Sequence, residues 1–459
     1  MEICENNWQK KMIGKSPIQE QKNLFQPLLT EFLNMEHELI LLSNEMSWDE
    51  LVKEFTSLYS NTGTPGKPIR LMCGLLILKQ LYDLGDETVI PAWIQNPYFQ
   101  YFCGEAHFQW KQPCDPSDLV HFRKRIGAEG IEKIFAQSVR IHGKQGQNKN
   151  INIDSTAQEK NITFPTDTKL RKKIIDKCVC IAKKENIELR QSYKRTVKKC
   201  LLQSRFSRHP KKRKQARAAQ RKIKTIAARL VRELYRKLPQ HTLSYHQNKL
   251  ALFTRVLNQQ INDKDKIYSL HEPEVSCIAK GKAHKPYEFG NKASIATTQN
   301  GNVIVAAVSF QGNPHDSKTL DKTLEQHQRI TGIEAQSANV DRGYRGVKRI
   351  RNTQIIMPDN GSSNTPYQKQ KMRNRFRRRA SIEPVISHMK HQYRMNTNYL
   401  KGATGDAINI MMSAAAFNFK SWMNKIRRKL FFAFSQITFA IDFILQLAFY
   451  STRLRVVKD

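Results

Sequence analysis

The sequence has few cysteines and few acidic residues, and both shortages narrow the kind of protein it encodes. It holds 8 Cys in 459 residues and no CxxC pair. A disulfide scaffold and a zinc ribbon are therefore not expected, and we interpret the thiols as reduced in a cytoplasm. The spacings of one Cys/His set match no standard zinc pattern: Cys103, His107, Cys114 and His121. Only 40 Asp and Glu stand against 77 Lys and Arg, a net charge of +37, which favours a nucleic acid partner over other polyanions.

Neither a signal peptide nor an uninterrupted membrane span is expected from the sequence. Its start, MEICENNWQKK, carries an early acid and no apolar core of signal-peptide length, so export is not expected. Phe431 to Tyr450 follows the basic run Lys425 to Lys429, as a positive-inside anchor would. Gln436, Asp442 and Gln446 interrupt it, and a charge in mid-span is costly. We interpret this stretch as a helix packed on the protein body or on a partner, with a membrane anchor as the alternative.

The first part of the chain is predicted to be helical. Between Pro68 and Leu84 apolar residues recur at helical spacing, after a Pro suited to a first turn. Asp115 or Ser117 is placed to cap a second helix. We therefore predict an N-terminal helical domain over 1–145 that binds DNA ends; a helical cap that only packs on the next domain is the alternative.

A strand followed by a very basic helical stretch comes next. Asn150 to Thr156 alternates in the way of a strand with one buried face, and Asp154 stands near its end. A basic helical insertion is predicted at about 169–265. It contains the acid-free run KKRKQARAAQRKIK, whose mutual repulsion phosphates would relieve; a solvated face is the alternative. The predicted phosphate contacts begin with Lys211, Lys212, Arg213 and Lys214.

Sequence patterns typical of β-strands follow the insertion. Lys292 to Thr298, the Asn300-Gly301 turn signal and Val303 to Phe310 predict a hairpin. A turn containing His315 and Asp316 then leads into a helix ending at about Arg329. These two residues are assigned either to a capped turn that holds the third strand or to support of the site.

The last predicted elements carry two further acids. The strand Ala335 to Val340 leads into Asp341, and Thr353 to Met357 is a last short strand before a loop over Pro358 to Tyr367. A helix then carries Glu383. Because Pro384 lies in its pattern, that helix starts either at Lys371, with a bend, or at Ile382.

Asp154, Asp341 and Glu383 thus stand at the ends of separate elements. The element order would place the first and fourth strands side by side and lay the late helix across their ends. Three carboxylates suit two Mg²⁺ ions, which prefer hard oxygen ligands and stabilise an in-line displacement at phosphorus; Mn²⁺ is the alternative. Taken singly, each acid could be an ordinary cap or surface charge.

Several segments resemble the bacterial insertion-sequence transposases of the DDE class, specifically the InsH-type group. The similarity runs from about Gly66 to Trp422, and its blocks are PIRLMCGLLILKQL, SDLVHFRKRI, NINIDSTAQEKNITFPTD, NPHDSKTL, NVDRGYRG and RRRASIEPVISHMKHQYRM. In the last block, Arg379, Glu383 and Lys390 match the Tyr-Arg-Glu-Lys signature of that class. Phe376 stands where the signature has Tyr, which removes a hydroxyl.

The resemblance implies an α/β protein with a ribonuclease H-like mixed sheet flanked by helices. The catalytic domain would span 146–425, with a C-terminal apolar helical tail at 426–459. Asp154, Asp341 and Glu383 would be the catalytic metal ligands, and Arg379 and Lys390 would contact phosphate. We add Arg375, Arg377 and Arg378 as part of a DNA track.

The implied activity is metal-dependent cleavage and transfer of strands of double-stranded DNA at element ends and target. It would be carried out by at least a dimer in a bacterial cytoplasm, on the nucleoid. The main alternative is a catalytically inactive transposase-derived DNA-binding protein. A nuclease of the same fold would share the site and lack only the joining step.

Overall fold

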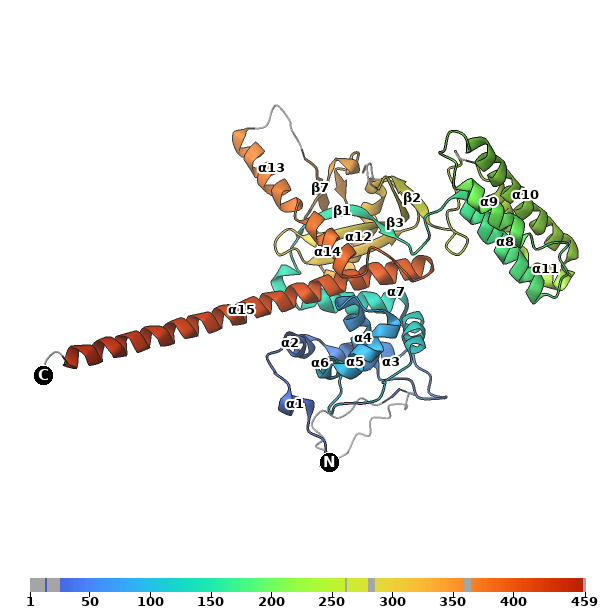
Figure 1. The fold of residues 1–459 in the computed structure, drawn as a ribbon. Coiled ribbons are helices and arrows are strands. Elements are labelled where there is room, and N and C mark those ends of the chain that lie inside the picture. Colours follow the sequence, from blue (N-terminus) through green and yellow to red (C-terminus); the bar gives the residue numbers. More distant parts are fainter. Residues whose placement is uncertain (1–12, 15–24, 261, 280–284, 359–364, 457–459) are drawn as a thin grey trace, which may run out of the picture.

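The computed structural model describes residues 13–14, 25–260, 262–279, 285–358 and 365–456 (Figure 1). The start of the chain and most of the loop predicted at Pro358 to Tyr367 lie outside these residues. So do residues 457–459 of the predicted tail.

A seven-stranded mixed sheet forms the centre of the molecule. Its order is β2-β3-β1-β5-β7-β6, with β4 paired to β3. β1 is antiparallel to β3 and parallel to β5, which confirms that the first and fourth predicted strands are neighbours. The predicted hairpin is confirmed as β3 and β4. The strands are β1 Asn150–Glu159, β2 Ser276–Ala279, β3 Tyr287–Thr298, β4 Ile304–Phe310, β5 Ser337–Asn339, β6 Arg349–Ile350 and β7 Thr353–Ile356.

The edge strand β4 is covered by side chains of two helices. Asn418 of α15 (Gly402–Val456) donates to the carbonyl of Ile304 at 2.9 Å and accepts from its amide at 2.9 Å. Gln326 of α12 (Leu320–Thr331) accepts from the amide of Ala307 at 2.7 Å. Backbone groups that would otherwise template the pairing of another chain are therefore satisfied.

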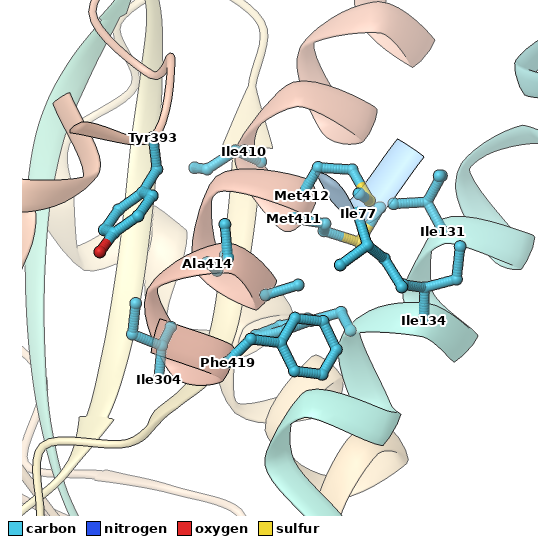
Figure 2. Close-up of a cluster of buried hydrophobic side chains, with 14 of the residues drawn as sticks. Ile77, Ile131, Ile134, Ile304, Tyr393, Ile410, Met411, Met412, Ala414 and Phe419 are labelled. Carbon is cyan, nitrogen blue, oxygen red and sulfur yellow. The ribbon is translucent and has the colours of Figure 1, made fainter. Parts of the chain in front are cut away.

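The N-terminal helices share one hydrophobic core with the sheet. α15 lies between them: Figure 2 shows Met411, Met412 and Phe419 meeting Ile77 of α4 and Ile134 of α7, with Ile304 of the sheet nearby. Asp115 caps α7, as predicted, by accepting from the amide of Ser117. The helices are α1 Leu29–Phe32, α2 Glu38–Glu45, α3 Trp48–Thr56, α4 Ile69–Leu81, α5 Asp86–Gln95, α6 Pro97–Phe102 and α7 Pro116–Arg140.

Four helices between β1 and β2 form a separate body beside the sheet (Figure 1). They have a second hydrophobic core, which includes Ile174, Ile223, Leu230 and Phe253. Apolar residues on one face of each helix therefore pack against one another rather than against the sheet. These helices are α8 Asp167–Lys184, α9 Lys194–Ser204, α10 Arg213–Lys237 and α11 Gln240–Asn258.

The helix that carries Glu383 starts at Ile382, one of the two starting residues that the sequence predicted, and a separate helix precedes it. α13 (Pro366–Arg379) ends and α14 (Ile382–Gln392) begins at Ile382, so Pro384 lies in a first turn, where its missing amide costs nothing. α14 packs against β1. α15 continues through the apolar stretch that begins at Phe431 and projects from the body (Figure 1). No helix among the described residues is long and apolar enough to cross a membrane.

Candidate active site

Asp154 and Asp341 occupy matching positions along two neighbouring segments. Asp154 lies in the middle of β1, not near the end of its strand as predicted, because β1 continues to Glu159, and Asp341 lies two residues beyond the end of β5. Asn152 of β1 is in register with Asn339 of β5, and their side chains share a 2.8 Å hydrogen bond. Asp154 lies two residues after Asn152, and Asp341 lies two residues after Asn339. Because side chains alternate along a strand, both acids follow the same face toward the same edge of the sheet.

The two acids differ in exposure. The Asp154 side chain is 17% exposed and accepts from the Ser155 amide at 2.8 Å. Asp341 is 44% exposed and caps a short 3-10 turn, Arg342–Tyr344, by accepting from the Gly343 amide at 2.9 Å. The turn redirects the chain immediately after the strand, and the second carboxylate oxygen of Asp341, Oδ2, faces Arg379.

Arg379 lies between these carboxylates. Its Nη2 is 3.4 Å from Oδ1 of Asp154 and 3.9 Å from Oδ2 of Asp341. It is the last residue of α13, so the break before α14 sets its position. Its buried Nε has no hydrogen-bond partner among the described residues. A guanidinium with a free donor beside two acids is suited to a phosphate oxygen.

Glu383 completes the acidic group from the first turn of α14, where it is exposed. Burial raises the pKa of the Asp154 carboxyl to about 6; the Arg379 charge opposes this, and the charges of Asp341 and Glu383 add to it. The structure thus brings all three predicted acids within electrostatic range of one another.

The donor set matches a hard divalent cation in its chemistry, because three carboxylates supply only oxygen ligands. In the described part of the chain, no three His, Cys, Asp or Glu side chains are close enough together to hold a metal ion as they stand. The Cys/His set that contains Cys103 and His107 therefore does not form a metal site either. At the acids, the positive charge of Arg379 lies beside the carboxylates that would bind a cation.

Polar side chains next to Asp154 form a small hydrogen-bonded group, of which the sequence indicated Asp316 but not Lys292. Asp316 accepts from the Ser155 hydroxyl at 2.6 Å and from Lys292 Nζ at 2.8 Å. His315 caps the same turn through the Ser317 amide. Asp316 therefore supports the residue next to Asp154, while His315 supplies the cap. Lys292 had no assigned role, since only the fold places its strand against this turn.

The other predicted phosphate ligands are spread over two surfaces. Lys390 lies roughly 10 Å beyond Glu383 along α14 at 1.5 Å per residue, with its Nζ 3.8 Å from Oε2 of Glu288. Arg375 donates to the Ser337 hydroxyl at 3.3 Å, whereas Arg377 and Arg378 are exposed. The structure therefore gathers Arg379 with the acids and does not bring the other predicted phosphate ligands to them.

Lys211, Lys212, Arg213 and Lys214 are exposed at the start of α10, and none forms an ion pair with another described residue. Cations at a helix N-terminus oppose the helix dipole, at a cost of about 0.3–1 kcal/mol each. Their position therefore does not favour stability, and it suits an external anion instead.

Two family models match the chain. The one described as "Transposase domain (DUF772)" matches residues 27–125, and the one described as "Transposase DDE domain" matches residues 260–419. A Rhizobium meliloti protein named "Uncharacterized protein ORF8 in nfe locus" is 37% identical over 198 residues, which are 42% of this chain and 96% of that protein. No solved structure matches the chain.

The mixed sheet, with one acid in the middle of β1 and another just beyond the end of its parallel neighbour β5, is consistent with the ribonuclease H-like class of polynucleotidyl transferases. The chain belongs to the insertion-sequence DDE transposases. DNA binding and use of divalent metals are typical of this family. Asp341, Arg379 and Glu383 lie inside the matched DDE range, whereas Asp154 lies between the two matched ranges. The InsH-type group stays a prediction.

Magnesium is expected to stabilise the protein more at neutral pH than in mild acid. The pKa of Asp154, about 6 when folded against 3.8 when unfolded, means that the native state holds an extra proton between these values. Without divalent ions, that proton's contribution to stability is complete below pH 3.8 and is lost as the pH rises through about 6. Above that pH the carboxylate is free for a cation.

The measurement is the rise in Tm on adding Mg²⁺ across this pH range. Asp154→Asn is the matched variant, because its side-chain amide stays uncharged across this pH range. Its Mg²⁺ response should therefore be small at every pH. A rise that is the same in acid and at neutral pH would contradict the prediction.

Proposed function

We propose that the chain is an active transposase that cleaves and joins DNA strands with Asp154, Asp341 and Glu383 as its metal ligands. The observation that supports this most is the matched position of Asp154 on β1 and of Asp341 just after the parallel strand β5, with Arg379 between the two carboxylates. Asp154 is rigid on a central strand, whereas Asp341 and Glu383 reach it from a turn and a helix start. Such a site is held by elements rather than loops, which favours precise geometry.

The residues divide the chemistry between them. Divalent ions, preferably two Mg²⁺, supply positive charge that stabilises the attacking and leaving oxygens at phosphorus. Arg379 is proposed to turn its donors to a phosphate oxygen, and Asp316 holds Ser155 and with it the strand position of Asp154. Cleavage breaks the phosphorus–O3′ bond as water adds, and it frees a 3′-hydroxyl. That hydroxyl then attacks a target phosphodiester: a new bond forms between its oxygen and the target phosphorus, the target's phosphorus–O3′ bond breaks, and the target strand leaves with a 3′-hydroxyl.

The remaining parts of the chain are assigned by surface and position. The helices within 1–145 are proposed to bind the element ends, and the insertion to hold flanking duplex through Lys211 to Lys214. Arg375, Arg377, Arg378 and Lys390 are proposed to guide DNA toward the acids. Joining two ends requires at least a dimer, with element ends and target as the DNA partners, in the cytoplasm of a bacterium.

The test is to incubate the purified protein with DNA flanking its own gene and Mg²⁺, with Glu383→Ala alongside. Free 3′-hydroxyl ends and joined products that are lost in the variant are expected. Cleavage without joining would identify a nuclease instead. Binding without cleavage, in Mn²⁺ as well as Mg²⁺, would point to an inactive DNA-binding protein.

Neutralising Lys211, Lys212, Arg213 and Lys214 to Gln is expected to weaken duplex binding and flatten its salt dependence. Each phosphate contact contributes a slope of about 0.9 in log affinity against log salt, so four contacts give up to about four units. Binding measured across a salt series checks this. An unchanged slope would show that the run is only a solvated surface.

A further inference from the structure

A basic groove with two tyrosines lies on the insertion. Its volume is about 1180 Å³, above the roughly 300–1,000 Å³ that small-molecule pockets occupy. It is formed by the segment after α8 and by the C-terminal half of α10. Its lining includes Arg190, Tyr193, Arg229, Arg232, Tyr235 and Arg236.

The groove is strongly cationic because its acids are few and one is already engaged. Glu233 accepts from the Arg190 amide at 2.9 Å and pairs with Lys237 at 2.9 Å. Glu188 is the other acid in the lining. Neither Arg232 nor Arg236 forms an ion pair with any residue the structure describes. Four arginines therefore face one unengaged acid, an arrangement that attracts phosphates.

Tyr193 is held in a strained conformation at this groove. Its φ is 56°, in the left-handed region that non-glycine residues rarely adopt. Its hydroxyl accepts from Arg229 Nη1 at 2.9 Å, and the Arg229 guanidinium carbon is 5.9 Å from the ring centre. Strained residues persist where the surrounding structure fixes them, and they cluster at ligand-binding sites. Tyr235 is 37% exposed in the same lining.

The groove continues a line of cations along α10. Lys214, Arg217, Arg221, Arg232 and Arg236 are exposed and fall on one face at 3.6 residues per turn, opposite the face that packs in the insertion core. Lys214 and Arg236 are 22 residues apart, or roughly 33 Å at 1.5 Å per residue. A nucleic acid backbone could follow this line from the start of the helix to the groove.

We infer that the groove binds unpaired DNA, with arginines on the phosphates and Tyr235 and Tyr193 against the bases. A cationic groove with aromatic faces is the arrangement that holds single strands, since stacking needs bases that are not already stacked in a duplex. The inference rests on the proposed function, because strand cleavage and joining leave unpaired segments beside the reacting ends. The groove adds to the acids a separate site that holds such a strand.

The test measures binding of the full chain to a labelled oligothymidylate of about 20 nucleotides, longer than the roughly 4–16 nucleotides that one groove covers, and to a duplex of the same length. Tyr235→Ala is expected to weaken single-strand binding about 10-fold, because stacking one base on an aromatic ring is worth about that much or more. Tyr235→Phe should restore it. Arg232→Gln with Arg236→Gln should lower the single-strand salt slope by about 1.4.

Tyr245→Ala is the matched control. Tyr245 is an exposed tyrosine of α11, 64% exposed, with Lys184 and Lys249 near its ring, and it lies outside the groove lining. Its replacement should leave single-strand binding unchanged. Equal losses for duplex and single strand, or no loss in Tyr235→Ala, would overturn the inference.

The outcome is separable from that of the proposed function. Asp154→Asn, which should not cleave DNA, is expected to bind the oligothymidylate as the unchanged protein does. If the unchanged protein binds single strands through the groove but never cleaves DNA, the proposed transposase activity is wrong and the inference about the groove stands. If it cleaves DNA and Tyr235 contributes nothing to single-strand binding, the inference is wrong and the proposed activity stands.

Discussion

Replacing Asp154 or Asp341 with Asn, or Glu383 with Gln, is expected to lower the rate of strand cleavage at least about 10²–10³-fold, the size seen when one charge-stabilising group is removed from an active site. Each substitution keeps the shape of the side chain and removes its negative charge. Asp154 should give the largest loss, because it is the most enclosed of the acids and lies on a central strand. Cleavage of a labelled element end in Mg²⁺ measures the rate.

Two controls make that result specific. DNA affinity should change little in all three variants, since phosphate contacts dominate binding. Asp321→Asn is a matched variant at an exposed acid of α12, which pairs with Arg351 at 3.2 Å, and it should cleave normally. A variant of the three that still cleaves at the full rate would remove its residue from the site.

Lys160→Met is expected to lower the free energy of unfolding by about 3–5 kcal/mol, because it leaves a buried charge without its partner. Lys160 Nζ lies 2.7 Å from Oδ1 of Asp406 and 3.4 Å from Oε2 of Glu272, and it donates to the Leu400 carbonyl at 2.8 Å. The side chains of Lys160 and Asp406 are 3% and 2% exposed. Denaturant unfolding measures the loss.

The contrast with an exposed pair tests the cause. Lys172→Met removes the ion pair of Lys172 with Asp176 on the surface of α8 and should cost at most about 1 kcal/mol. Adding Asp406→Asn to Lys160→Met should recover part of the stability, because the Asp406 charge is then removed and only that of Glu272 is left without Lys160. A cost for Lys160→Met no greater than for Lys172→Met would show that the buried pair has no special weight.

Local sequence patterns predicted many of the helices and strands, but they did not predict the side-chain contacts between segments far apart in the sequence. Alternation and the Asn300-Gly301 turn predicted the hairpin, and Pro384 marked the start of α14 at Ile382. The parallel pairing of β1 and β5 followed from element order. The assignment of catalytic and phosphate-binding residues stays a prediction.

What the sequence did not predict depends on side chains that meet only in three dimensions. Nothing local shows that Asn418 would pair with the backbone of Ile304, or that Lys160 would meet Asp406 across 246 positions. Nor does it show that Lys390 would lie against Glu288 rather than beside Asp154. The groove was missed because its strained Tyr193 looks like any other tyrosine in the sequence.

The second hydrophobic core gives the insertion an evolutionary independence that the rest of the chain lacks. Its apolar residues pack among themselves, so substitutions there leave the packing around the acids unchanged. The length, charge and surface of this body can therefore change without repacking the core around the acids, so that DNA preference and catalysis can be altered separately.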